Sequence, residues 1–158
     1  MATPTNLPAA QTTGNVLTAA YVNDLRGAFR ILQVVTGTAN SQVGPIGGSY
    51  TNAGLSATIT PSSNTSKILV AAQVNYYNDS TAKSTWNLVR GSTQINESNP
   101  LGGDVANIDG SIFLTFFDSP ATTSATTYKV QGKCGGGGTY FRASASAICT
   151  IFLLEISA

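Results

Sequence analysis

The sequence predicts a mainly β protein: an antiparallel, jelly-roll-like β-sandwich that follows an N-terminal extended arm and one short helix. Apolar and polar residues alternate with period two over much of residues 49–158, and Gly, Pro, Ser and Asn mark corners between the alternating segments. Only 9% of the residues are charged, whereas 42% are apolar; an ordinary soluble protein has about 25% charged residues. We therefore expect a surface of small polar residues that is partly covered by other chains.

Residues 1–16 are expected to form an extended attachment arm, because Pro4 and Pro8 favour extended backbone in the residues before them. This end has no basic segment followed by an apolar one, so we expect no secretory signal and synthesis in a reducing cytoplasm. Two cysteines are too few for a disulfide-stapled scaffold, so Cys134 and Cys149 are expected to be free thiols.

Residues 17–35 are expected to form a short amphipathic helix and a connector, with Thr18 as the N-cap. The apolar residues recur at spacings of three, four and three, at Val22, Leu25, Phe29 and Leu32. A helix of ~14 residues is marginal in isolation. This stripe must therefore pack on its own domain or against identical helices around a symmetry axis.

Residues 36–48 are rich in Gly, Thr and Ser and are expected to form a linker before the β-sandwich domain of residues 49–158. Eight segments of that domain have the composition of strands: 55–60, 67–77, 85–89, 92–95, 111–117, 126–133, 139–145 and 147–156. Strands at this spacing, separated by turn residues, predict an antiparallel sandwich or jelly roll.

Two of the expected strands, 112–117 and 147–156, are apolar on both faces. In the second, one face carries Ile148, Phe152, Leu154 and Ile156, and the other carries Cys149, Ile151 and Leu153. A sandwich strand needs only one buried face. We expect the face of Cys149, Ile151 and Leu153 to be a subunit interface, the alternative being that a loop or the N-terminal helix of the same chain covers it.

The sequence offers little catalytic or metal-binding chemistry. It has no histidine, which excludes Ser-His-Asp triads and imidazole metal sites, and we predict no cofactor. A carboxylate pair for glycoside hydrolysis would have to come from distant strands. With eight basic and seven acidic residues the net charge is +1, so nucleic acid is not an expected partner. No apolar run approaches the ~20 residues of a membrane span, so we expect no membrane insertion.

Aromatic side chains are the remaining candidates for recognition, because exposed tyrosines bind both sugars and proteins. Tyr77 and Tyr140 are the candidate exposed contacts. Trp86 alternates in phase with Leu88 and is expected in the core.

Two segments resemble parts of bacteriophage virion proteins. Residues 15–26, NVLTAAYVNDLR, resemble the segment with which many tail-fibre and minor structural proteins begin, and residues 54–70, GLSATITPSSNTSKILV, are similar to the opening of a β-domain found in such proteins. The segments 117–120, 127–130 and 154–156 lie where that domain has similar residues. The resemblance implies a component of the virion, with other phage structural proteins of the capsid or tail as its partners.

The strand rhythm also resembles the trimeric jelly rolls of the tumour-necrosis-factor kind, which implies a homotrimer. Three functions remain open. The first is a short trimeric fibre or knob that is attached through its N-terminal segment and adheres to a glycan or protein of the host surface. The second is a capsid decoration or cement protein, and the third is a carbohydrate-active enzyme, which the missing histidines and sparse carboxylates disfavour.

Overall fold

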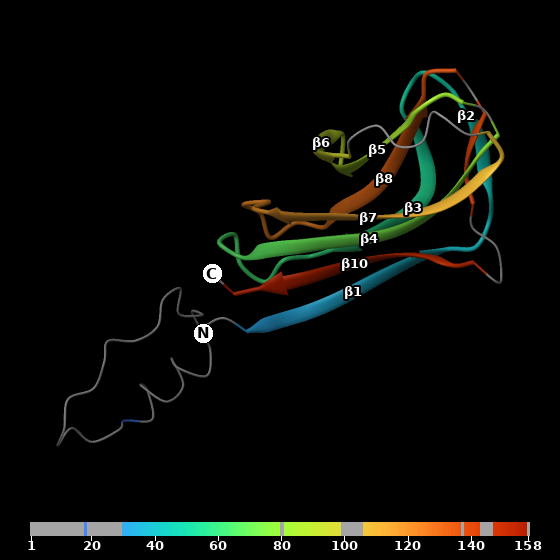
Figure 1. Ribbon diagram of the computed structural model, residues 1–158. Helices are drawn as coiled ribbons and strands as arrows, with labels where there is room; N and C mark the ends of the chain where they lie inside the picture. Colours follow the sequence, from blue (N-terminus) through green and yellow to red (C-terminus); the bar gives the residue numbers. More distant parts are fainter. Residues whose placement is uncertain are drawn as a thin grey trace, which may run out of the picture.

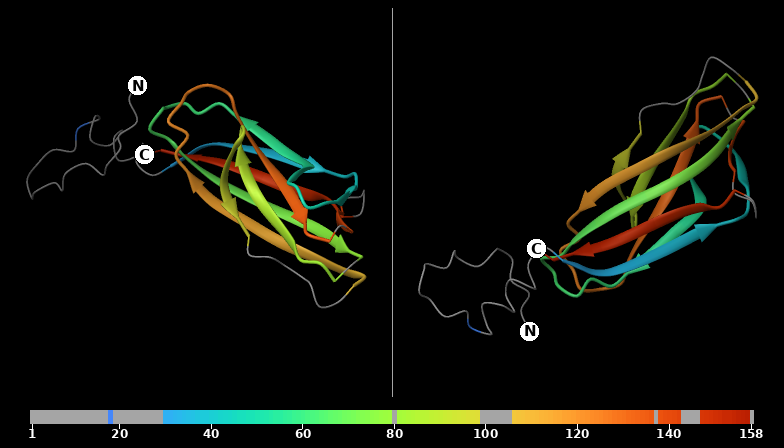
Figure 2. Two further views of the ribbon diagram at one scale, coloured as in Figure 1. Left: turned by 90° about the horizontal axis from the view of Figure 1, so that it is seen from above. Right: turned by 60° about the horizontal axis from the view of Figure 1, so that its bottom comes forward.

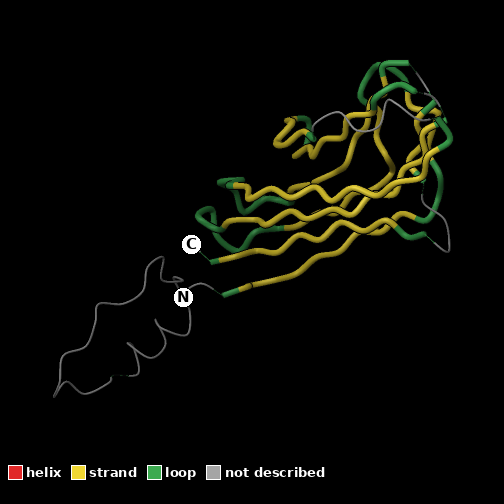
Figure 3. Tube along the Cα trace, in the orientation of Figure 1, coloured by secondary structure: helices red, strands yellow, loops and turns green. Residues whose placement is uncertain are grey.

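The computed structural model describes residue 18 and residues 30–79, 81–98, 106–136, 138–142 and 147–157. Within these ranges the only regular secondary structure is strand, arranged in two antiparallel sheets (Figure 3). The mainly β prediction is therefore confirmed. The predicted arm and the helix positions Val22, Leu25 and Phe29 lie outside the described residues.

The first sheet, sheet A, contains β1 (Ile31–Ala39), β2 (Val43–Ile46), β4 (Lys67–Asn78), β7 (Ile108–Asp118), β9 (Thr139–Phe141) and β10 (Cys149–Ile156). Strand β7 pairs with β4 from Ile68 to Asn78. Strand β7 thus occupies one edge of β4. Along the other edge of β4, β10 pairs first and β9 pairs near the end of the strand. Strands β1 and β2 then pair with β10 and β9, respectively (Figure 1).

The second sheet, sheet B, has the order β3-β8-β5-β6. Its strands are β3 (Thr51–Ile59), β5 (Ser84–Arg90), β6 (Thr93–Glu97) and β8 (Thr126–Cys134). These strands, with β4, β7, β9 and β10, match the eight strand segments expected from the sequence. Buried positions alternate with more exposed ones along β3, β4, β8 and β10, as expected of strands that bury one face.

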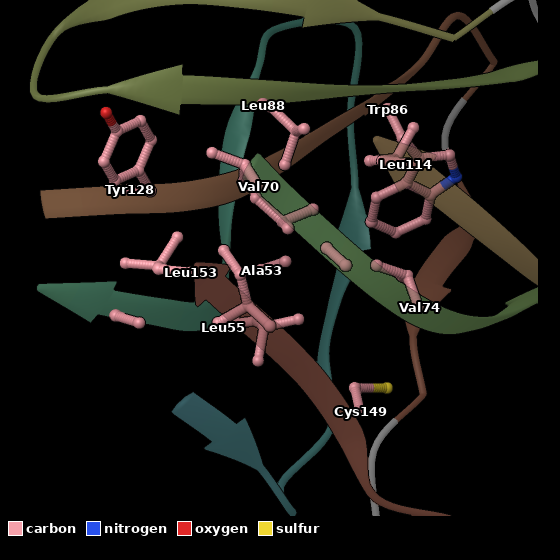
Figure 4. Packing of buried hydrophobic residues seen from close by; sticks show 14 of the residues in the cluster. Ala53, Leu55, Val70, Val74, Trp86, Leu88, Leu114, Tyr128, Cys149 and Leu153 are labelled. Atoms are coloured by element: carbon pink, nitrogen blue, oxygen red, sulfur yellow. The ribbon is translucent and has the colours of Figure 1, made fainter. Parts of the chain in front are cut away.

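One hydrophobic core lies between the two sheets (Figure 4). Sheet A contributes alternate residues of β4 and β10, such as Val70 and Leu153, and sheet B contributes Leu55, Leu88 and Trp86. Trp86 is fully buried, as the sequence predicts.

Two boundaries expected from the sequence are wrong. Leu32, which was expected at the end of a helix, is in β1, and the expected linker 36–48 contains the end of β1 and all of β2. The physical reason is pairing: β1 runs antiparallel to β10 from Ile31–Ile156 to Ala39–Cys149. This pairing places Leu32 in a strand, although Leu32 continues the helical spacing of the apolar residues before it.

The chain enters and leaves the described domain at the same end. The backbone N–H of Ser157 donates to the carbonyl of Arg30 at 3.0 Å, and the N–H of Arg30 donates to Oγ of Ser157 at 3.0 Å. Figures 1 and 2 show β1 starting and β10 ending side by side there, whereas β2 and β9 lie at the opposite, distal end.

Glu155 is a fully buried carboxylate that anchors the last strand to the corner between β3 and β4. Its Oε1 accepts hydrogen bonds from the backbone N–H and the hydroxyl of Ser62, both at 2.7 Å, and its Oε2 accepts one from Nε2 of Gln33 at 2.6 Å. Burial alone would raise the pKa of Glu155, but the polar groups of Ser66, Gln33 and Ser62 outweigh it and lower the pKa on balance.

We expect Glu155→Gln to destabilise the fold by about 1–3 kcal/mol at pH 7. The NH₂ group of glutamine would lie against the groups of Ser62 or Gln33 that now donate to a carboxylate oxygen. The lowered pKa means that the carboxylate stabilises the wild-type protein above the usual Glu pKa of 4.5, and that this contribution disappears as the pH falls through the lower folded-state pKa. Urea denaturation between pH 7 and 3 measures both effects. Equal stability of wild type and variant at pH 7 would contradict this role.

Candidate functional site

The outer face of sheet A carries several exposed apolar side chains. Phe113 and Phe117 of β7 are 65% and 52% exposed, and Phe152 of β10 is 39% exposed. Val34 of β1 and Ile148, just before β10, are also exposed. The right view of Figure 2 shows β1, β10, β4 and β7 side by side. Contiguous apolar patches of this kind on a protein surface mark interaction sites.

The strand register aligns these side chains in rows across the sheet. One row runs Val34, Leu154, Leu69 and Phe117, and the next runs Thr36, Phe152, Ala71 and Thr115. Neither row contains a charged residue. We call the surface of these two rows, together with Phe113 and Ile148, the apolar face.

The outer face of sheet B is polar. Oγ1 of Thr58 lies 2.8 Å from Oγ1 of Thr127, and the amide of Gln131 donates to Oδ1 of Asn52 at 2.9 Å. A sandwich that exposed both outer faces to water would carry polar residues on both. The two outer faces of the sandwich therefore differ in polarity.

The face of β10 that was expected to be a subunit interface points instead into the core of the domain. Cys149, Ile151 and Leu153 are fully buried between the sheets, and Cys134 is a buried thiol like Cys149. These three residues of β10 belong to the hydrophobic core, and hydrogen bonds from Ser62 and Gln33 allow Glu155 on the same face to be buried. Leu32 is half-buried in β1. The exposed face of β10 carries Phe152, and Ile148 precedes the strand.

A second surface feature lies at the distal end of the same sheet, where the register pairs Tyr77 with Tyr140. Their ring centroids are 6.0 Å apart at an interplanar angle of 39°, and both side chains are half-exposed. The guanidinium carbon of Arg142 lies 5.1 Å from the centroid of the Tyr77 ring. Sequence reasoning selected the two tyrosines separately, and the fold brings them together.

Hydrogen bonds fix this tyrosine cluster. The hydroxyl of Tyr77 donates to Oδ1 of Asn107 at 2.7 Å, and Nη1 of Arg142 donates to Oδ1 of Asp109 at 2.7 Å. Two open hollows of ≈ 640 and ≈ 600 Å³ share Arg142. Residues lining the first include Asn75, Ser111 and Ile148, and those lining the second include Gln42, Asp79 and both tyrosines.

No pattern in the sequence pointed to Arg142 or Asp109 as site residues. Arg142 directly follows β9, and Asp109 lies opposite Tyr77 on β7, so only the register of the sheet places them beside the tyrosines. The alternation of Phe113 and Phe117 with Ile112, Leu114 and Phe116 was the signal for the apolar face.

The buried charged cluster elsewhere in the domain is structural. Nη1 of Arg90 donates to both carboxylate oxygens of Asp118, at 2.8 and 2.9 Å, and the Tyr128 hydroxyl donates to Oδ2 of Asp118 at 2.6 Å. Burial and the neighbouring carboxylate raise the pKa of Tyr128, which keeps its hydroxyl protonated as a donor. The contacts pin the end of β7 to β5 and β8.

Across the described ranges no three metal-ligating side chains form a group that could hold an ion. The same ranges contain no helix that is long and apolar enough to cross a membrane. No protein-family model matches the chain, and no curated protein matches its sequence. The apolar face and the tyrosine cluster are therefore the two features from which a function can be argued.

Proposed function

We propose that this protein is a non-enzymatic structural subunit of a bacteriophage particle and works as a homotrimer, in the form of a short fibre or knob. The observation that carries the self-association is the exposed apolar face of sheet A. The assignment to a phage particle rests on the sequence resemblance of residues 15–26 and 54–70 to virion proteins.

The order of the strands supports a jelly roll. Four antiparallel pairs are nested in the chain: β1 with β10, β3 with β8, β4 with β7, and β5 with β6. Successive pairs alternate between sheet A and sheet B. This is the pattern of a two-stranded ribbon wound around a core, as in the jelly rolls of viral capsid and lectin domains. The analogy concerns the fold only.

Three copies arranged around an axis bury their apolar faces in a closed assembly. A cyclic arrangement lets the same surface be used by every copy without leaving one exposed. The number three rests on the resemblance of the strand rhythm to trimeric jelly rolls. The low content of charged residues, 9%, agrees with a surface that is partly buried by assembly.

The positions of the two ends of the domain suit a fibre or knob. Arg30, at the start of the described domain, exchanges hydrogen bonds with Ser157, which follows the last strand. Attachment through the segment before Arg30 would leave the distal end, with Tyr77 and Tyr140, facing away from the particle. The distal end is then the part that meets a host surface.

A capsid decoration protein is the second candidate. The observation that favours it is the position of β1, which starts at Ile31 with no repeated shaft sequence among residues 1–30. Such a compact subunit fits directly over joints between capsid proteins.

Labelling the chain in purified particles distinguishes the two roles and tests the proposal. We expect an antibody against the chain to be seen by electron microscopy on the particle surface, and we expect a variant without residues 1–29 to be absent from the particles because β1 remains but the attachment segment does not. Label on the tail supports a fibre or knob, and label over the head supports decoration. Particles that lack the wild-type chain, or that retain the truncated one, would contradict the proposed attachment.

A further inference from the structure

The tyrosine cluster combines the two kinds of group that hold a sugar. The pyranose ring of a hexose has an apolar face of C–H groups, which packs on an aromatic ring, and a rim of hydroxyls, which need planar donors and acceptors. Tyr77 and Tyr140 supply half-exposed rings. Gln42, Asp79 and Arg142 line the hollow beside them.

From this arrangement we propose that the distal hollow bounded by Tyr77, Tyr140, Arg142, Asp79 and Gln42 is a binding site for a neutral, hexose-containing oligosaccharide. The proposal goes beyond the structural role, because it concerns what the purified chain binds and does not require a particle.

The charges of the site select against an acidic sugar. Arg142 already donates to Asp109 at 2.7 Å, and Asp79 adds a second carboxylate to the same surroundings. These three side chains together carry one net negative charge. A sialylated or sulfated glycan would meet this charge, whereas neutral hydroxyls can donate to the carboxylates and accept from the guanidinium.

Contacts within the chain hold the side chains around the hollow. Tyr77 and Tyr140 are on paired strands, Asn107 holds the Tyr77 hydroxyl, and Asp109 holds the Arg142 guanidinium. Side chains that are already fixed lose little conformational freedom on binding. This rigidity favours recognition of a small ligand by weak contacts, repeated in each copy of an oligomer.

A small polar ligand fits this hollow better than a protein partner does. Protein interfaces centre on a desolvated apolar core, and such a surface exists on this sheet only at the apolar face. The hollow of ≈ 600 Å³ is lined by Gln42, Asp79 and Arg142 besides the two tyrosines, so it has no aliphatic centre. Its volume suits one or two sugar rings.

Saturation-transfer difference NMR on the full-length chain tests the proposal. The probes are neutral di- and trisaccharides of glucose, galactose, mannose and N-acetylglucosamine at millimolar concentration, with 3′-sialyllactose as the acidic comparison. We expect transfer to at least one neutral sugar and weaker transfer to sialyllactose. In Tyr140→Ala and in Tyr77→Ala, the affinity for that sugar should fall at least about tenfold, because each ring is a stacking surface.

Tyr50→Ala is the matched control, because Tyr50 also lies under a cation, with Nζ of Lys133 4.4 Å from its ring centroid, but does not line the hollow. This variant should bind the sugar like wild type. Three results would overturn the proposal: no transfer to any sugar of the panel, transfer that survives both tyrosine substitutions, or equal loss in Tyr50→Ala. If the panel fails and Tyr140→Ala instead lowers the mass of the oligomer, the hollow belongs to a contact between copies.

Discussion

The variant Leu153→Asp is expected not to fold. Leu153 is fully buried between the sheets and pairs with Val35 and Val70 on its neighbouring strands. Loss of a core leucine side chain costs about 2–5 kcal/mol, and a carboxylate without a partner in the same place adds several more. The sum is comparable to the whole stability of a domain, about 5–15 kcal/mol.

Circular dichroism during heating measures this effect, and Leu153→Met is the control that keeps the volume of the side chain. We expect the methionine variant to melt within a few degrees of wild type, because such exchanges cost less than about 1.5 kcal/mol, and the aspartate variant to show no cooperative transition. A folded monomer of Leu153→Asp with unchanged melting would restore the sequence-based hypothesis that this face is the subunit interface.

The second prediction concerns Phe152, the residue before Leu153 on the same strand. Phe152→Asp should leave the protomer folded and abolish the oligomer, because Phe152 lies on the apolar face and is 39% exposed in the single chain. Full burial of a phenylalanine contributes about 1.5–3 kcal/mol. Phe152 has 39% of its surface left to bury, so loss of the ring alone weakens each contact by roughly three- to sevenfold. The unpaired charge adds to this loss.

Ser56→Asp is the matched control for Phe152→Asp, because it places the same charge on the polar outer face of sheet B, opposite Lys129. It should change neither the melting temperature nor the mass. Light scattering measures the mass of each variant, and circular dichroism shows that it is folded. A Phe152→Asp protein that keeps the wild-type mass would show that the apolar face is not the contact between copies.

Most of the fold could be predicted because period-two alternation is a direct consequence of a strand with one buried face. Strand β1 could not, since Leu32 continued a helical spacing and Thr36–Ala39 is rich in small polar residues. Its β-branched residues Val34 and Val35 were the available signal. Strand β2 contains Gly44 and Pro45, residues that ordinarily mark a loop.

The candidate site could be predicted only in part. Alternation showed that β10 has two apolar faces, but it cannot tell which one faces the core when both are apolar. Glu155 lies on the buried face, where Ser62 and Gln33 donate hydrogen bonds to its carboxylate. Those partners are distant in sequence, so only the folded chain reveals them.

The central claim, that the apolar face of sheet A joins identical copies into a trimer, is tested most directly by the molar mass of the full-length chain in solution. Size-exclusion chromatography with multi-angle light scattering at micromolar concentration measures this mass. We predict a single species of about three times the chain mass of 16.2 kDa. A stable species of 16.2 kDa under the same conditions would contradict the claim.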